Sequence, residues 1–412
     1  MEMKKNKRMS CFICKGDNLF KFLSLGHQPP SDAFLTTEMF DEHEITYPLD
    51  LFMCENCHLV QLGYIVDPKI LFSKDYAYNS GTNKTLKENF KNLTSKLVSL
   101  YKLTENDLAV DIGSNDGSLL ESYSAHKVKI LGIDPSGVTE LAIKNGQPTI
   151  VDFFNEGTAR IAQKKYGKAK IVTATNVFAH VNDLHSFMRG IKTLLANDGV
   201  FVSESGYTRD MIEGLQYDFI YHEHLRYLTL KPLTKLFEKF RMEIIEAERI
   251  PIHGGSIRVH AAIKNRYPVS STVKKLLAEE KKVGLYNKKT YIKFAKEVEK
   301  MKLNLQKILI DIKTLGHRIA GIGAPAKGNT LLNYCKIDSQ IISYLVETSE
   351  RKIGQFSPGM RIPVVEESFL IKDQPEYALL LSWTIAPILI KKLREKGYKG
   401  KFILPAPKPK VL

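Results

Sequence analysis

Short apolar segments alternate with helical segments through the middle of the chain. Apolar runs of strand length occur at Leu108–Ile112, Val128–Asp134, Lys170–Thr175 and Gly199–Glu204. The segment Leu119–His126 has helical character and separates the first two. Strands that alternate with helices predict βαβ units and a parallel sheet. We therefore expect an α/β domain here.

The last third of the chain repeats this alternation. Residues 268–312 are strongly charged and have helical periodicity, so they predict long helices. Pro405–Pro409 is expected to mark the end of compact structure, and Trp383, the only tryptophan, is expected at an edge or in the core. The strands expected in this second α/β sheet are His317–Ile322, Ser343–Glu347, Tyr377–Trp383 and Lys401–Leu404.

Composition favours an ordinary globular protein of two to three domains. The chain has 412 residues, of which 43% are hydrophobic and 25% charged. The net charge of +15 comes from lysines spread over helical stretches, not from a block that would bind nucleic acid. No apolar run is long enough to cross a bilayer, and the first residues lack a signal-peptide core. We expect a cytoplasmic protein without a membrane or nucleic-acid partner.

Four of the five cysteines form two closely spaced pairs. Cys11-x-x-Cys14 and Cys54-x-x-Cys57 can present four thiolates tetrahedrally, which is the arrangement that Zn²⁺ prefers. A closed site of four thiolates leaves no position for a reactive water, so a structural zinc is predicted. Cys335 lies in a helical pattern and is expected to be a buried thiol.

The turn after the first strand predicts a cofactor site. Gly113-Ser114-Asn115-Asp116-Gly117 has two glycines, and Asp134 follows about 20 residues later at the end of the next strand. The turn lacks the third glycine of a dinucleotide motif, and its acids suit a cationic cofactor without phosphates. It resembles motif I of class I S-adenosylmethionine (SAM)-dependent methyltransferases, which implies that Asp134 binds ribose. The residues expected at the cofactor are Asp111, Gly113, Asn115, Asp116, Gly117, Asp134, Phe153, Asn176, Phe178 and His180.

A dense group of ionisable side chains follows at Tyr221-His222-Glu223-His224. Histidine is a natural general base near neutral pH, a carboxylate can orient it, and tyrosine can donate to a developing oxyanion. A metal site or an incidental surface cluster are the alternatives. Methylation of nucleic-acid bases is disfavoured because residues 176–179 read Asn-Val-Phe-Ala in place of (N/D)PP(Y/F), and no Pro-Cys dipeptide occurs.

The ordered set of motifs resembles the nucleotide-sugar C-methyltransferases of deoxysugar biosynthesis. The motifs are the two cysteine pairs, the glycine turn, the Tyr-His-Glu-His segment, His253–Val259 and the Gly-rich Gly321–Thr330. The resemblance implies a zinc-binding domain at 1–72, a class I SAM-binding domain at 73–265 and a Rossmann-like substrate domain at 266–412. It also implies methylation of a TDP- or GDP-linked 4-keto-deoxysugar, commonly at C3, through an enolate.

Carried over by position, the resemblance makes His224 the base, Glu223 its partner and Tyr221 a neighbour of the sugar. Tyr76 or Tyr78 is expected to face the substrate as well. His222, Lys327 and Asn329 are expected to bind the substrate, Lys327 through the diphosphate; the alternative for the Lys327 loop is a structural βα turn. O- or N-methylation of a small metabolite is the rival activity, and a zinc-ribbon protein that binds nucleic acid is a third hypothesis. The oligomeric state is open, with a monomer as one possibility.

Overall fold

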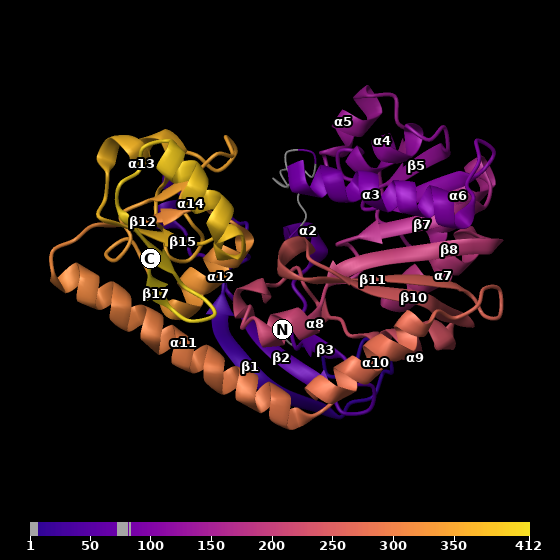
Figure 1. Ribbon diagram of the computed structural model, residues 1–412, viewed down its shortest axis with the longest axis horizontal. Coiled ribbons are helices and arrows are strands. Elements are labelled where there is room, and N and C mark those ends of the chain that lie inside the picture. The colour runs from indigo at the N-terminus through magenta and orange to yellow at the C-terminus, as the bar shows by residue number, and fades with distance from the viewer. Residues whose placement is uncertain (1–6, 72–80, 82–83) are drawn as a thin grey trace.

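The computed structural model describes residues 7–71, 81 and 84–412. Tyr76 and Tyr78 lie outside these residues. The described chain forms three β-sheets (Figure 1). Within it, no helix combines the length and the apolar character needed to cross a bilayer.

The N-terminal sheet is antiparallel and has the order β1-β2-β3-β9. Its last strand is contributed by a distant part of the chain, directly after the Tyr-His-Glu-His segment. A 3-10 helix at Thr37–Asp41 and helix α2 at Pro68–Leu71 complete the described N-terminal region. The strands are β1 (Leu19–Gln28), β2 (Tyr47–Cys54), β3 (Val60–Leu62) and β9 (Arg226–Tyr227).

The middle sheet has seven strands in the order β10-β11-β8-β7-β4-β5-β6. The five strands from β8 to β6 run parallel, and β11 and β10 add an antiparallel edge. This is the α/β sheet expected from the alternating pattern. The strands are β4 (Leu108–Ile112), β5 (Lys129–Ile133), β6 (Thr149–Ile150), β7 (Ala169–Thr175), β8 (Leu195–Gly206), β10 (Met242–Ile250) and β11 (Ser256–Ile263).

Helices flank the middle sheet, and capping side chains define where some of them begin. Asn155 and Asp183 each accept hydrogen bonds from two backbone N–H groups of the helix that follows. The helices are α3 (Lys84–Tyr101), α4 (Ser118–Ser124), α5 (Thr139–Lys144), α6 (Glu156–Tyr166), α7 (Leu184–Leu194), α8 (Thr208–Glu213), α9 (Leu230–Lys239) and α10 (Ser271–Val283). Helix α10 packs on β10 and α9, so a helix that follows the expected domain boundary at residue 265 still covers the middle sheet.

The C-terminal sheet has six strands in the order β14-β13-β12-β15-β16-β17, and only β17 is antiparallel to its neighbour. The long helix α11 reaches it from the other two sheets (Figure 1). The elements are α11 (Lys288–Thr314), β12 (Ile319–Ile322), α12 (Ala326–Cys335), β13 (Leu345–Glu347), β14 (Val364–Glu366), α13 (Glu367–Asp373), β15 (Tyr377–Leu380), α14 (Ala386–Glu395), β16 (Lys401–Leu404) and β17 (Lys410–Val411).

Two sequence expectations for this region are wrong. Compact structure does not end at the proline-rich Pro405–Pro409, because β17 follows it and pairs with β16. Trp383 does not end a strand but begins a 3-10 helix, Trp383–Ile385, and its indole N–H donates to Asp218 at 2.7 Å. Cys335 is fully buried on α12, as expected.

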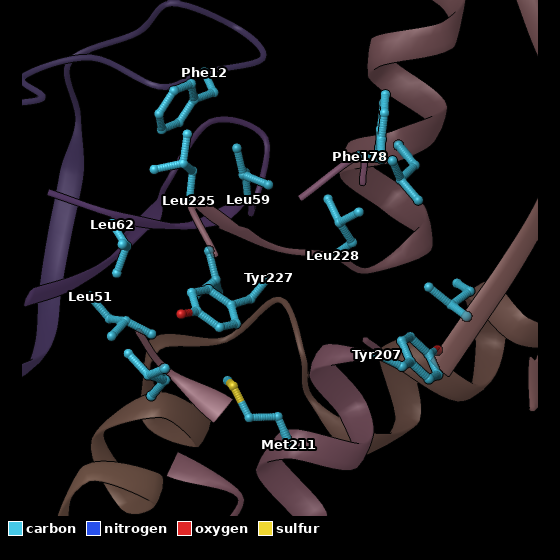
Figure 2. Packing of buried hydrophobic residues seen from close by; sticks show 14 of the residues in the cluster. Phe12, Leu51, Leu59, Leu62, Phe178, Tyr207, Met211, Leu225, Tyr227 and Leu228 are labelled. Carbon is cyan, nitrogen blue, oxygen red and sulfur yellow. The ribbon is translucent and has the colours of Figure 1, made fainter. Parts of the chain in front are cut away.

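One hydrophobic core joins the N-terminal and middle regions. Phe12, Leu51 and Leu62 from the cysteine-bearing region pack in the same cluster as Leu225 and Tyr227 (Figure 2). All five are at most 3% exposed. Burial of such side chains contributes about 1.5–3 kcal/mol each, so the small N-terminal sheet is stabilised by its neighbour as well as by its own core.

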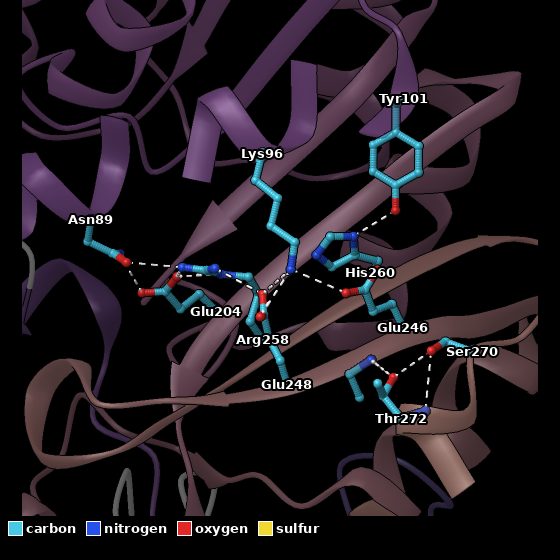
Figure 3. Close-up of polar contacts among 11 residues, drawn as sticks. Asn89, Lys96, Tyr101, Glu204, Glu246, Glu248, Arg258, His260, Ser270 and Thr272 are labelled. Carbon is cyan, nitrogen blue, oxygen red and sulfur yellow. Dashed lines mark hydrogen bonds and ion pairs between the residues drawn. The ribbon is translucent and has the colours of Figure 1, made fainter. Parts of the chain in front are cut away.

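A buried polar network attaches α3 to the middle sheet. The guanidinium of Arg258 on β11 binds Glu204 at 2.8 Å, and it also donates to Asn89 on α3. Lys96, about two turns after Asn89 on the same face of α3, binds Glu248 at 3.0 Å (Figure 3). Glu204 is fully buried, so its charge needs these partners. The network holds α3 on a face of the sheet, where Phe90 packs in one cluster with Val202 on β8 and Ala262 on β11.

Candidate active site between the two α/β domains

A cavity of about 980 Å³ opens at the carboxyl ends of the middle parallel strands. In an open α/β sheet this is where ligands bind. The glycine turn after β4 forms one end of the cavity, and the loops after β12 and β13 form the other. The cavity therefore connects the two α/β domains. Predicted residues that line it are Asp111, Gly113, Asn115, Asp134, Phe153, Asn176, His180, Tyr221, Glu223, His224 and Lys327.

The carboxylate of Asp134 organises the cofactor end of the cavity. One oxygen accepts from the backbone N–H of Ser136 at 2.7 Å, and the other accepts from the N–H of Asn115 at 3.1 Å. These bonds fix the carboxylate beside the glycine turn at the end of β5. In this arrangement a ribose that enters the cavity meets an oriented acceptor, which is the role expected for Asp134.

The turn after β4 needs glycine for steric and conformational reasons. Gly113 has φ of 71°, and a Cβ there would stand 2.1 Å from Val177. Gly117 and Asp116, both expected at the cofactor, instead shape the turn. Gly117 precedes α4 with φ of 81°, and the carboxylate of Asp116 accepts from Ser118 N and from Gly81 N.

Asp111, which precedes the turn, is almost fully buried. Its carboxylate accepts a hydrogen bond from the hydroxyl of Thr173 at 2.6 Å. Burial raises its pKa to about 7, and the charge of Asp134 adds to this effect. A cationic group at this end of the cavity would favour the ionised form.

Phe178, expected at the cofactor, belongs to the core. It is fully buried and packs against Phe187 and Phe201 at ring-centroid distances of 5.5 and 5.9 Å. Phe153, by contrast, lines the cavity and is 42% exposed. Of the two phenylalanines assigned to the cofactor, only Phe153 offers it an accessible ring.

His224 has one defined tautomer. Its Nδ1 lies 2.9 Å from the carbonyl oxygen of Phe219, so Nδ1 carries the hydrogen and Nε2 carries the lone pair. The imidazole ring contacts the tilted rings of Tyr221 and Phe219, at centroid distances of 3.9 and 4.3 Å. Burial, helped by nearby His180, holds its pKa well below the ordinary value. A neutral imidazole with a fixed lone pair can accept a proton.

Glu223 does not have the partner expected from the sequence. Among the described residues, no hydrogen bond joins it to His224, whose Nδ1 is taken by Phe219. Burial and the charge of Asp32 raise the pKa of Glu223, while Lys352 opposes the rise. Lys352 binds Asp32 at 3.1 Å. The carboxyl of Glu223 therefore belongs to a cluster made by all three regions of the chain.

Two other residues expected at the substrate contact protein groups instead. His222 is 1% exposed, and its Nε2 lies 3.3 Å from the carbonyl oxygen of Tyr47 on β2. Asn329 is 1% exposed and donates to the carbonyl of Ser31 at 2.7 Å. The segment turns at His222 and Glu223, where the N–H of His224 donates to the carbonyl oxygen of Tyr221 at 3.0 Å. This turn separates the two imidazoles, so His222 contacts the N-terminal sheet while His224 lines the cavity.

Lys327 and His253 line the cavity beside His224. The Lys327 Nζ donates to the carbonyl oxygen of His253 at 3.2 Å and lies 4.6 Å from the centre of the Phe219 ring. Burial and Lys327 together lower the pKa of His253 to about 4. Sequence reasoning quoted the motif that contains His253 but gave this residue no role. It also gave none to Asp32 or Lys352.

The four paired cysteines converge as predicted. Their sulfur atoms all lie within 4.8 Å of one another, with Cys11 and Cys57 at 3.4 Å and Cys14 and Cys54 at 3.5 Å. A tetrahedral zinc with Zn–S bonds of about 2.3 Å requires sulfur separations of about 3.8 Å. The donor set and its size fit Zn²⁺.

Comparison with known proteins decides the family. Residues 11–72 match a zinc-binding domain, residues 86–247 a methyltransferase domain and residues 251–407 the C-methyltransferase C-terminal domain. The chain is 32% identical over 407 residues to the C-methyltransferase NovU from Streptomyces niveus, covering 98% of this chain and 96% of NovU. It belongs to the SAM-dependent C-methyltransferases. The resemblance stated from the sequence motifs is thereby confirmed, as is the α/β fold class.

Two solved methyltransferases each match less than half of this C-methyltransferase. A SAM-dependent methyltransferase from Clostridium acetobutylicum is 11% identical, and the match covers 43% of this chain and 92% of that one, with a TM-score of 0.34. A magnesium protoporphyrin IX methyltransferase from Synechocystis with bound SAM is 13% identical, covering 42% and 78%, with a TM-score of 0.33.

The cofactor end of the cavity fits SAM. The hydroxyl of Ser114 is buried in the cavity wall and has no hydrogen-bond partner in the described protein. Asp134 presents its carboxylate at the end of β5, and Phe153 presents an exposed ring. These groups can hold the hydroxyls and the adenine of an adenosine. The acids Asp111 and Asp134 suit a cofactor whose charged centre is cationic.

Proposed function

We propose that the enzyme methylates a ring carbon of a nucleotide-linked 4-keto-deoxysugar, at C3, through an enolate formed by His224. The single observation that carries the proposal is the geometry of His224. Its lone pair is assigned to Nε2 by the Nδ1 bond to Phe219, and the ring borders a cavity that continues to the SAM motif. When bound, SAM supplies an electrophilic methyl group.

The chain's own residues provide the proton chemistry. A C–H bond next to a ketone is acidic enough for a positioned base, and such a base contributes about 10²–10⁴-fold in rate. Nε2 of His224 takes the proton, and the C–H pair becomes the carbon nucleophile. Burial favours neutral His224 before this step, because it disfavours the imidazolium. The cavity of about 980 Å³ supports a large substrate such as a nucleotide sugar together with the cofactor.

We further propose the C-terminal domain as the binding surface for the nucleotide part. The loops after β12 and β13 contribute Pro325, Ala326, Glu347 and Ser349 to the cavity wall opposite the SAM motif. This placement supports a substrate that spans both α/β domains.

The test is mass spectrometry with SAM and a panel of TDP- and GDP-linked 4-keto sugars, run in H₂O and in D₂O. We expect one sugar to gain a single CH₂ and to lose one ring C–H. In D₂O without SAM, the same hydrogen exchanges with solvent. Methylation without loss of a C–H bond would mean O- or N-methylation, the second candidate activity, and would refute the proposed carbon chemistry.

His224→Asn tests the base. We expect methylation and hydrogen exchange to fall by about 10²-fold or more while SAM binds with unchanged affinity. His222→Asn is the matched control, since its ring contacts Tyr47. The His222 variant keeps the exchange rate within a few-fold of the wild type, even if its stability falls.

A further inference from the structure

Lys327 occupies an unusual position for a residue expected to bind a diphosphate. It lies in the first turn of α12 (Ala326–Cys335), the helix labelled in Figure 1, which packs against the 3-10 helix Tyr217–Phe219. Its ammonium lies over the Phe219 ring at 4.6 Å, and the same ring lies 4.3 Å from the His224 ring. The Phe219 ring therefore contacts both the proposed base, His224, and the ammonium of Lys327.

A strained turn holds this ammonium in place. His253, Gly254 and Gly255 have φ of 55°, 87° and 119°, three consecutive positive values that begin at a residue with a side chain. Such backbone costs free energy and persists where surrounding contacts enforce it, frequently at functional sites. Gln216 enforces it by donating to the carbonyl of Gly254 at 2.7 Å. The turn thereby directs the carbonyl of His253 at Lys327.

The ammonium keeps donors for a ligand. Lys327 has three N–H groups, and one binds His253. Within the described residues, no carboxylate forms an ion pair with it at 4.0 Å or less. Asp218 acts on it electrostatically, and one oxygen of that carboxylate accepts from the indole N–H of Trp383. An anion in the cavity beside His224 would therefore meet an available cation.

We propose that Lys327 is a catalytic residue that donates a hydrogen bond to the enolate oxygen formed when His224 removes the proton. The proposal rests on the proposed function and deepens it. His224 Nε2 takes the proton, the C–H electron pair becomes the C=C bond, and the carbonyl π pair moves to oxygen. That oxygen carries the negative charge, and Lys327 faces it. The C=C pair then forms the new bond to the methyl carbon, while the methyl–sulfur bond of SAM breaks and its electron pair stays on sulfur, leaving a neutral thioether. The pair on oxygen restores the ketone, and His224 later returns its proton to water.

The rival role for Lys327 is binding of the substrate diphosphate. The two roles predict different kinetics. An enolate donor acts mainly after the proton is removed, so its loss slows the reaction at saturating substrate. A lysine that binds the diphosphate interacts equally with the substrate before and after proton removal. Its loss therefore weakens substrate binding and leaves the saturated rate nearly unchanged. Burial, which lowers the pKa of Lys327, makes its ammonium a stronger donor.

The experiment measures SAM-independent exchange of the ring hydrogen in D₂O, using the keto sugar that the wild-type enzyme methylates. For Lys327→Met we expect the saturated exchange rate to fall by about 10²–10³-fold, the usual effect of losing one oxyanion donor. The dissociation constant of the sugar nucleotide, measured by calorimetry, should change by less than about tenfold. Methylammonium added to Lys327→Ala should restore part of the exchange rate.

The contrary result is a saturated exchange rate within a few-fold of the wild type, together with a large rise in the dissociation constant. That outcome would make Lys327 a diphosphate ligand. SAM affinity and circular dichroism of Lys327→Met establish that the variant is folded, and Lys327→Ala with methylammonium provides the test if it is not. If wild-type enzyme exchanges no hydrogen on any keto sugar, the proposed function fails first, and this is distinguishable from failure of the Lys327 variants alone.

Discussion

Replacing Phe178 and Phe153 by alanine, one at a time, separates a core residue from a cofactor contact. Phe178 is fully buried among three aromatic rings, Phe187, Phe201 and Phe237, at centroid distances of 5.5, 5.9 and 6.4 Å. A buried phenylalanine truncated to alanine costs about 3–5 kcal/mol. At about 2–4 °C for each kcal/mol in a domain of this size, Phe178→Ala should lower Tm by about 6–20 °C.

Phe153→Ala should behave in the opposite way. Its ring is 42% exposed, so its loss should move the free energy of unfolding by about 0.5 kcal/mol or less. A lost aromatic contact to adenine of about 0.5–1.5 kcal/mol should raise the SAM dissociation constant about 2- to 10-fold. Calorimetric titration with SAM, well below Tm, and thermal unfolding without SAM measure the two effects. Unchanged Tm with weakened SAM binding in Phe178→Ala would refute the assignment of Phe178 to the core.

Three further predictions follow from the same contacts. Removing zinc with a chelator, or replacing Cys54 by serine, should lower Tm without abolishing SAM binding. We expect the metal to stabilise the N-terminal sheet, whereas the cofactor end of the cavity is formed by the middle domain. Thermal unfolding together with metal analysis measures the effect. Because the pKa of His224 is lowered below 6.5, the rate of hydrogen exchange should rise with pH to a plateau, with the midpoint of the rise below pH 6.5. A midpoint above pH 6.5 would contradict His224 as the base. Lys352→Met should destabilise the protein by about 1–3 kcal/mol, because it removes the cation that binds Asp32 and acts on Glu223. Asp32→Asn in the same chain should recover part of this loss, as measured by denaturant unfolding.

The parts of the site that the sequence predicts are those that depend on local spacing. Asp134 ends a strand about 20 residues after the glycine turn, and parallel strands bring such positions to one edge of the sheet. The cysteine pairs are local in the same sense, because each pair forms one turn. That the two pairs lie together is a three-dimensional property, but it can be predicted because zinc prefers four tetrahedral ligands.

The parts that the sequence does not predict depend on contacts between distant segments. Asp32 and Lys352 are separated by most of the chain and meet only because the C-terminal domain docks on the N-terminal region. His253 reaches the cavity through three residues of positive φ, which no hydrophobic pattern reveals. Alternation along a strand would place His222 and His224 on the same face, and only the turn between Tyr221 and His224 separates their directions.

The contact between β3 and β9 explains how a structural zinc bears on catalysis. Val60 pairs with Tyr227 and Gln61 with Arg226, and Leu225 alone separates this strand from His224. The buried guanidinium of Arg226 lies 4.4 Å from the ring centre of Phe12, which adjoins the zinc ligand Cys11. The same guanidinium donates to the carbonyl oxygens of Phe178 and Val181, which flank His180.

The zinc-binding region therefore supports two histidines of the cavity through one arginine and one strand pairing. A shift of the N-terminal sheet by one residue would turn Arg226 to the opposite face, since successive side chains of a strand alternate. It would break the bonds on both sides of His180 and displace the backbone that leads into His224. A closed Cys₄ site leaves no position for a reactive water, yet the position of the proposed base depends on the sheet that carries two of the four cysteines' neighbouring strands, β2 and β3.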